Sequence, residues 1–303
     1  MSDKKIVVDG LTKSFFSNQG ALPVINGVSF SVDDGEFVAI VGPSGCGKST
    51  LMNIIAGFER QDFGWVKVDG VERVGPSAKG IMISQHGSVF PWLTVQQNLI
   101  FGLKGNGHGD KGALAKHYAA MVGLKGFEAA YPHELSGGML KRVELARALV
   151  VKPEILYMDE PFSALDALMS LRMRTELQRI LDEERHTVLL ITHDVEEAIY
   201  MADRIIVLSP RPTTIQSTFH VSLPHPRKLS GPEAQSLREA ILKELGLLRV
   251  YTQPGVQRGA SCDSRLPNRG GLEAQATVLV DLRGMEADPD SHAERPARRA
   301  SAG

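Results

Sequence analysis

The stretch GPSGCGKST, Gly42 to Thr50, decides the fold of this chain. It matches the phosphate-binding pattern G-x-x-x-x-G-K-[ST]. The apolar run FVAIV, residues 37–41, stands directly before it, and a helix-forming stretch from Ser49 to Ala56 follows, with Gly57 as its C-terminal cap. A strand, a glycine-rich loop and a helix in this order favour a nucleotide-binding α/β fold, because the loop amides and the helix N-terminus can face a phosphate.

Each position of this loop has a physical role. The glycines let the backbone wrap closely around phosphate oxygens. Lys48 is expected to reach the β- and γ-phosphates, and the Ser49 hydroxyl is expected to ligate Mg²⁺. The residues predicted to surround the phosphates are Gly42, Pro43, Ser44, Gly45, Cys46, Gly47, Lys48, Ser49 and Thr50.

Composition narrows the classes of function. The chain has 303 residues, 43% of them hydrophobic and 23% charged, and a formal net charge of −1. No basic field predicts a nucleic-acid partner. The two cysteines, Cys46 and Cys262, make no disulfide framework, which favours a reducing, cytosolic setting. The polar N-terminus is unlike a signal peptide, and no apolar run approaches the roughly 18 residues that span a bilayer. Any membrane role would therefore need other chains.

Strand and helix patterns alternate along the chain. Strands are predicted at 37–41, 81–85, 155–158, 188–192 and 204–208. The helical patterns between them predict a mostly parallel sheet covered on both faces. The runs within 6–37 and 64–74 read as β-structure, with a hairpin turn at Asp69-Gly70. Residues 91–151 read as mostly helical, interrupted by a glycine-rich flexible loop at 104–112.

The composition changes near Tyr251. Gly, Ala, Arg, Pro and Ser dominate from there to residue 303, so the tail is predicted to be largely disordered. Within it, the run TVLVDL, Thr277 to Leu282, reads as a possible strand, and a regulatory or docking role for the tail stays open.

A second half of a nucleotide site is predicted by ILYMDE, Ile155 to Glu160. Two carboxylates follow a buried strand, at the end of an α/β sheet where ligands bind. Asp159 is expected to hold the hydration shell of Mg²⁺. Glu160 is then placed to act as general base toward an attacking water.

Two further polar residues follow predicted strands. The amide of Gln85 can contact Mg²⁺ or the attacking water without adding charge. His193 can donate to a γ-phosphate, although a single His at such a place is more often structural.

The segment LSGGM, Leu135 to Met139, predicts another anion site, because a serine and two glycines precede a helix. One domain rarely needs two such sites. If Ser136, Gly137 and Gly138 serve the same ATP as Lys48, they come most simply from a second copy of the chain.

These motifs, in this order, resemble the nucleotide-binding subunits of ABC transporters over about residues 5–225. The resemblance rests on six elements: GPSGCGKST (Walker A), Gln85 (Q-loop), LSGGM (signature), ILYMDE (Walker B), SALD at Ser163 to Asp166 (D-loop) and His193 (H-loop). It implies that Asp166 lines the nucleotide interface. It also implies that an aromatic near the N-terminus stacks on adenine, with Phe15 as the best match and Phe16 as the near alternative.

The resemblance implies an α/β P-loop NTPase core of the RecA-like type, with an antiparallel β-subdomain and an inserted α-helical subdomain at about 88–150. Residues 1–250 would be the nucleotide-binding domain. The implied cofactors are ATP and Mg²⁺. The implied partners are a second nucleotide-binding subunit, transmembrane permease subunits and, indirectly, an extracytoplasmic solute-binding protein. The expected location is the cytoplasmic face of the cell membrane, as a peripheral subunit.

Flanking stretches such as VFPWLTVQQNLIFGL, LDALMSLRMRTELQRI and ADRIIVLSPRPTTI look like the importer branch for nitrate, sulfonate, taurine and related small anions. There are departures from the family. Met139 stands where Gln is frequent, Leu140-Lys141 stand where Arg-Gln is commoner, and His86 follows Gln85 where an acidic residue is usual. These changes put helix-surface and permease contacts in doubt, but not the phosphate site.

Three other classes of protein fit the sequence less well. A soluble ABC-type ATPase of translation or DNA repair would carry tandem domains, coiled-coil insertions or basic stripes. A P-loop kinase or GTPase would not need LSGGM or His193, and no N-K-x-D string is present. A non-enzymatic subunit with a degenerate site is disfavoured by the intact Lys48, Asp159 and Glu160.

Overall fold

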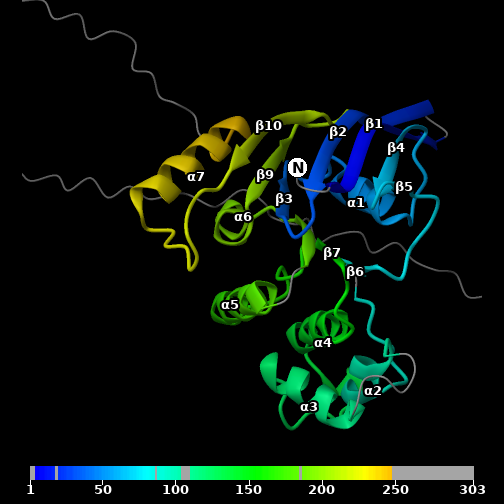
Figure 1. Ribbon diagram of the computed structural model, residues 1–303, viewed down its shortest axis with the longest axis vertical. Helices are drawn as coiled ribbons and strands as arrows, with labels where there is room; N and C mark the ends of the chain where they lie inside the picture. The colour runs from blue at the N-terminus through cyan, green and yellow to red at the C-terminus, as the bar shows by residue number, and fades with distance from the viewer. Residues whose placement is uncertain (1–3, 18–19, 86, 104–109, 184–185, 248–303) are drawn as a thin grey trace, which may run out of the picture. The chain divides into compact units, whose positions relative to one another are not determined.

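The phosphate loop lies on a six-stranded sheet with the order β10-β9-β3-β8-β7-β6. The computed structural model describes residues 4–17, 20–85, 87–103, 110–183 and 186–247 (Figure 1). The strands are β3 (Phe37–Val41), β6 (Gly80–Ile83), β7 (Ile155–Asp159), β8 (Thr187–Ile191), β9 (Arg204–Leu208) and β10 (Ile215–His220). All neighbours are parallel except β10, which runs antiparallel to β9. The predicted mostly parallel sheet is confirmed, and β10 is an additional strand.

The central strands are buried on both faces. Every residue of β3, β7 and β8 is buried. Alternate side chains enter opposite hydrophobic cores. Val38 and Ile40 pack with helix α1 (Lys48–Ala56) and the antiparallel sheet, whereas Ala39 and Val41 pack in the other core. This two-sided burial explains why these strands read as continuous apolar runs.

A second sheet, antiparallel, has the order β2-β1-β4-β5. Its strands are β1 (Lys4–Ser17), β2 (Gly20–Asp33), β4 (Phe63–Val68) and β5 (Val71–Glu72). The predicted hairpin is confirmed: Asp69 and Gly70 both have positive φ, 51° and 75°, between the paired Val68 and Val71. β1 and β2 are longer than the short runs predicted, because register shifts within the pair let each strand continue past irregular positions.

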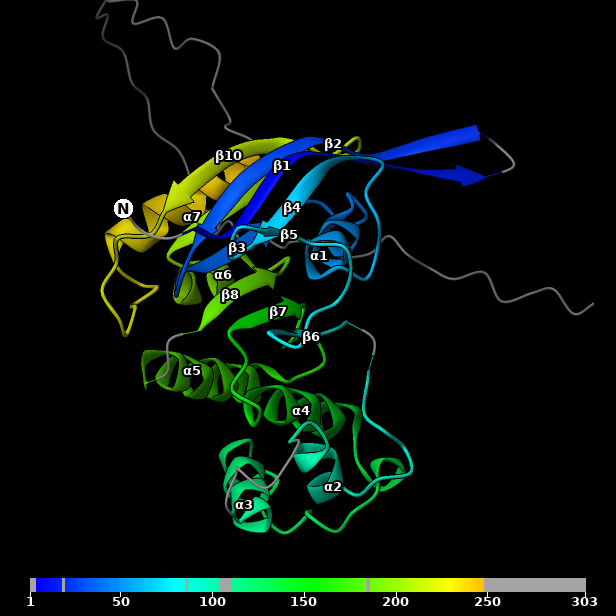
Figure 2. The ribbon, with the colours of Figure 1, turned by 45° about the vertical axis from the view of Figure 1, so that its right-hand side comes forward.

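The predicted helical stretch is observed as α2 (Val95–Ile100), α3 (Lys111–Met121), the 3₁₀ helix η1 (Pro132–Glu134) and α4 (Gly137–Leu149). Figures 1 and 2 both show α2, α3 and α4 gathered together, away from the antiparallel sheet. Side chains cap each α-helix, with Thr94 on α2, Asp110 on α3 and Ser136 on α4. Of the predicted flexible loop, 104–109 lie outside the described residues.

Three more helices complete the described chain: α5 (Ala167–Glu183), α6 (Val195–Met201) and α7 (Pro232–Glu244). The cap at Gly57 is confirmed, with φ 86° and backbone bonds to Asn53 O and Ile54 O. In the described ranges, no helix combines the length and apolar character needed to cross a membrane. The predicted tail, with Thr277 to Leu282 and Cys262, lies outside the described residues, as does His86.

Candidate functional site

The phosphate loop joins β3 to α1 and depends on glycine at two positions. Gly45 has φ 70° and Gly47 has φ 116°, which is backbone geometry that L side chains rarely adopt. A Cβ atom added to Gly47 would also lie 2.6 Å from Val24 Cγ1. Gly47 caps α1 without a side-chain hydrogen bond, so the first amides of the helix are left for a ligand.

Lys48 is held against its own loop. Its side chain is buried, and its Nζ donates to Gly42 O at 2.9 Å and to Pro43 O at 3.0 Å. Carbonyl oxygens are weaker partners for an ammonium ion than phosphate oxygens are. The predicted position of Lys48 at the loop therefore fits an anionic ligand.

Asp159 ends β7 with a carboxylate of which one oxygen lacks a partner. The residue is 3% exposed, and no hydrogen-bond donor in the described part of the chain reaches its Oδ1. Burial raises the pKa of Asp159, a hydrogen bond from Ser49 lowers it, and the neighbouring Glu160 charge raises it. An orphaned carboxylate oxygen beside a serine hydroxyl fits a Mg²⁺ site. In the described part of the chain, no set of three His, Cys, Asp or Glu side chains could hold a metal ion by itself.

Glu160 brings the other predicted catalytic residues together. Its Oε1 lies 3.3 Å from His193 Nδ1, and its Oε2 accepts from Gln85 Nε2 at 3.5 Å. These residues follow β7, β8 and β6, so the carboxyl ends of three parallel strands converge here. Glu160 has φ 49°, an unfavourable geometry for a residue with a Cβ, and its N–H donates to Ile191 O at 2.9 Å. Such strain is typical of functional sites.

Glu160 and His193 line a cavity of about 260 Å³, together with Arg174 and Glu197. Glu197 accepts from Thr192 Oγ1 at 2.7 Å, while its Oε1 has no hydrogen-bond partner among the described side chains and backbone. Burial raises the pKa of Glu197 to about 7. The Thr192 hydrogen bond and the Arg174 charge oppose that rise, and Asp194 adds to it.

The predicted second anion site lies elsewhere in this chain. Ser136 Oγ accepts from Met139 N at 3.3 Å, and a Cβ added to Gly138 would lie 3.4 Å from Ala164 O. Asp166 caps the start of α5 by accepting from Met169 N at 2.9 Å. No hydrogen bond or ion pair between described residues joins Ser136, Gly137, Gly138 or Asp166 to the phosphate loop.

Phe15 and Phe16 lie near the end of β1 and are 41% and 83% exposed. The Lys13 ammonium lies 5.1 Å from the centroid of the Phe15 ring. Both rings are accessible for stacking, so the choice between them as the adenine platform stays a prediction.

Sequence reasoning missed two sets of supporting residues. Thr213 braces the phosphate loop from the β9–β10 turn: its Oγ1 donates to Cys46 O, and its N–H donates to Val24 O at 2.8 Å. No sequence pattern marks this contact, because Thr213 is 167 residues from Cys46. The other set is Lys141, Glu144 and Arg147 on α4. The sequence did contain a pattern that could have indicated this set, because charged residues spaced by three positions interrupt an otherwise apolar helix face.

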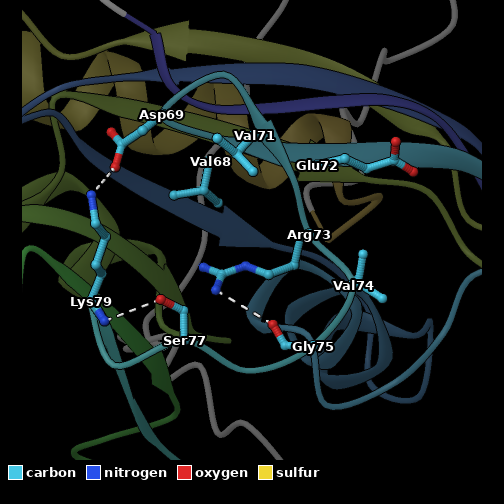
Figure 3. A pocket seen from close by; sticks show the side chains of 9 residues that line it. All are labelled: Val68, Asp69, Val71, Glu72, Arg73, Val74, Gly75, Ser77 and Lys79. Carbon is cyan, nitrogen blue, oxygen red and sulfur yellow. Dashed lines mark hydrogen bonds and ion pairs between the residues drawn. The ribbon is translucent and has the colours of Figure 1, made fainter.

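A different pocket, of about 340 Å³, lies at the β4–β5 hairpin and the segment before β6 (Figure 3). Three of its charged side chains, Asp69, Lys79 and Arg73, bond with nearby protein groups. Lys79 Nζ lies 2.8 Å from Asp69 Oδ2, and Arg73 Nη1 donates to Gly75 O at 3.5 Å. None of the predicted nucleotide-binding residues lines it.

Comparison with known proteins shows the family of this chain. The family model described as ABC transporter matches residues 25–163. An uncharacterized ABC transporter ATP-binding protein of Methanocaldococcus jannaschii is 42% identical over 80% of this chain and 91% of its own length. This chain belongs to the ABC transporter ATP-binding family. Among other ABC proteins, the aliphatic sulfonates import ATP-binding protein SsuB of Bacillus cereus is 39% identical over 79% of this chain and 95% of its own. The nitrate import ATP-binding protein NrtD of Synechocystis is 45% identical over 72% and 82%.

A solved ABC structure gives the same fold. It is a dimeric ATP-binding cassette in a post-hydrolysis state bound to ADP and Pi, with TM-score 0.65 and 28% identity over 71% of this chain and 98% of that one. This chain has the ABC cassette fold and is an ABC transporter ATPase, the ATP-binding subunit of its transporter.

Proposed function

We propose that this subunit energises an importer for nitrate, a sulfonate, taurine or a related small anion. The observation that carries the catalytic part is the approach of Gln85 and His193 to Glu160, within 3.5 Å and 3.3 Å, next in sequence to Asp159, whose Oδ1 has no hydrogen-bond partner among the described groups. The anion class is supported by the similarity to the sulfonate and nitrate import proteins.

The phosphate loop would bind the triphosphate through its amides and Lys48, and Phe15 would stack on adenine. Mg²⁺, held by Ser49, Asp159 and Gln85, would neutralise charge that develops on the transferring phosphoryl group. Glu160 would accept the proton of the attacking water. His193 and Gln85 would contact the γ-phosphate region and orient these groups.

A second copy would supply Ser136, Gly137 and Gly138 to the same ATP, with Asp166 at the interface. This arrangement is supported by the solved neighbour, which is a dimer bound to ADP and Pi, and among the described residues no hydrogen bond or ion pair joins these groups to the phosphate loop. ATP would bridge the two copies, so binding closes the pair and hydrolysis reopens it.

We further infer that residues 1–250 form the nucleotide-binding domain and about 88–150 a helical subdomain that docks on a permease. The groove near Gln85 and Pro91–Trp92 would receive a short permease helix, and Trp92 is 68% exposed. This would place the subunit at the cytoplasmic face of the cell membrane.

The test is reconstitution with candidate permease and solute-binding subunits of an anion importer. We expect Mg-ATP to dimerise the Glu160→Gln variant, and the wild type to drive uptake of one small anion with ATP turnover. A Glu160→Gln variant that stays monomeric with Mg-ATP and the permease would contradict the shared-nucleotide proposal. ATPase activity that no permease alters would favour the alternative, a soluble ABC-type ATPase.

Lys48→Ala tests the phosphate loop directly. We expect loss of nucleotide binding or of hydrolysis by about 100-fold or more, because a charge-assisted contact to the phosphates is removed. Equilibrium binding of a fluorescent ATP analogue and steady-state ATPase measurements check this. Unchanged activity would count against the assigned role of the loop.

A further inference from the structure

Helix α4 carries three charged side chains on the face that meets the segment after β6. Lys141 is 6% exposed and Glu144 is 2% exposed, and the third, Arg147, is half-buried. Charges are rarely buried without a partner, because desolvation costs several kcal/mol per ion.

These side chains hold the backbone on both sides of Gln85. Lys141 Nζ donates to Ser84 O and lies 3.2 Å from Glu144 Oε2. Glu144 Oε1 accepts from Ser88 N. Arg147 donates to Ser88 O at 2.8 Å and to Ser88 Oγ at 2.6 Å.

The three contacts form one unit. The Lys141 ammonium lies at ion-pair distance from Glu144 Oε2, an atom that accepts no hydrogen bond among the described groups. Each of the two side chains also bonds to the backbone near Gln85, and such buried polar contacts restrict their members to few geometries. The strand β6 ends at Ile83, so ladder hydrogen bonds no longer hold the chain where Gln85 extends toward Glu160.

We propose that the Lys141–Glu144 pair positions Gln85 for the reaction by fixing Ser84 and Ser88 to α4. The contacts to Ser84 and Ser88 hold the chain beyond the last residue of β6, so the Gln85 amide stays within reach of Glu160. This inference rests on the proposed function, because it assigns Gln85 a part in ATP turnover.

The test uses the double variant Lys141→Met/Glu144→Met in the full chain. Either single change would leave one member of the buried ion pair without its partner and lower stability, whereas the double change removes both members together and keeps the Arg147 bonds to Ser88. We expect kcat of ATP hydrolysis to fall about tenfold, since small misplacements of a catalytic group are costly. The KM for ATP should change less than twofold, because the phosphate loop is untouched.

Combination with Gln85→Ala separates positioning from general damage. If the pair acts through Gln85, the double variant costs nothing further in a Gln85→Ala background. The matched control is Arg227→Met, which removes a buried cation that donates to Ile199 O at 3.0 Å and Ala202 O at 2.6 Å, away from Gln85. Any effect of the control on kcat should multiply with that of Gln85→Ala.

Three kinetic results would overturn the proposal. The first is an unchanged kcat in the double variant. The second is a double variant that lowers kcat by the same factor in the wild-type and in the Gln85→Ala background. The third is a Gln85→Ala variant with the kcat of the wild type.

Hydrogen exchange gives a readout that does not depend on turnover. Peptides containing Ser84 and Ser88 should exchange faster in the double variant, because the Ser88 amide loses its acceptor there. Their exchange should be unchanged in Arg227→Met. Equal exchange in all three proteins would overturn the proposal even if the chain showed no ATPase activity. Absence of ATPase activity with the expected exchange would count against the proposed function and not against the placement by α4.

Discussion

Charged residues lie at both ends of the parallel strands, but those at the amino ends have oppositely charged partners and Asp159 at the carboxyl ends has an oxygen without one. At the carboxyl edge, Asp159 is buried with an unpaired oxygen. At the amino edge, Lys5 Nζ lies 2.7 Å from Glu154 and 2.9 Å from Asp69, and Lys79 lies 2.8 Å from Asp69. The charges at the amino edge are satisfied by one another.

The pKa directions follow this difference. Hydrogen bonds from Lys79 and Lys5 lower the pKa of Asp69, and one from Lys5 lowers that of Glu154. Burial instead raises the pKa of Asp159. Acids at the amino edge therefore favour their charged form, whereas Asp159 is short of positive charge. A ligand site is therefore expected where the protein leaves a buried charge without a partner, and not where charged residues are most numerous.

The largest expected effect is that of Glu160→Gln on turnover. We expect kcat to fall by about 10²–10⁴-fold, the usual contribution of a general base, while ATP binding is retained. Steady-state hydrolysis and nucleotide titration measure the two quantities. If the variant hydrolysed ATP at the rate of the wild type, the assignment of Glu160 as general base would be contradicted.

Asp159→Asn should separate function from stability at the same edge. We expect ATPase activity to fall about 100-fold, because the anionic metal ligand is lost. The nucleotide-free protein should gain about 1 kcal/mol, because an unsatisfied neutral amide costs less to bury than an unsatisfied carboxylate. Thermal unfolding would then shift up by about 2–4 °C. A variant less stable than the wild type would mean that Asp159 is already compensated.

Glu197→Gln should stabilise the protein in a pH-dependent way. The folded-state pKa of about 7 exceeds the ordinary value of 4.5, so stability from the protonated form is present below pH 4.5 and is lost as pH rises through 7. We expect the variant to gain up to about 3 kcal/mol at pH 8 and little at pH 5.

Urea unfolding at both pH values measures this gain. The exposed neighbour Glu196, changed to Gln, serves as the control and should show no such pH dependence. A Glu197→Gln gain that is the same at both pH values would contradict the proton-linked explanation.

Lys5→Met addresses the amino edge and has the smallest expected effect. We expect a loss of about 1–2 kcal/mol in the free energy of unfolding, because Lys5 is buried but its partners are partly exposed. Lys4→Met is the control, since its pair with Asp33 is exposed and should contribute less than about 1 kcal/mol. ATPase kcat should stay unchanged in both; a tenfold loss in Lys5→Met would abolish the contrast between the edges.

Much of the fold was readable from local patterns. The strands β3, β7, β8 and β9 lie close to their predicted ranges because two-sided burial makes them continuous apolar runs. The Asp69-Gly70 turn and the Gly57 cap were readable because each needs positive φ. β10 and α7 were missed, since the exposed alternation of β10 has too few buried residues to mark a strand.

The phosphate loop and the acidic pair at Asp159-Glu160 were determined by the sequence alone, because their chemistry depends on neighbouring residues and fixed spacing. Only the tertiary structure decided which distant residues complete the site. Gln85, Glu160 and His193 meet because three parallel strands end at one edge, and Thr213 and the Lys141–Glu144 pair support them through contacts across the fold. Such contacts are set by packing, which no local pattern encodes.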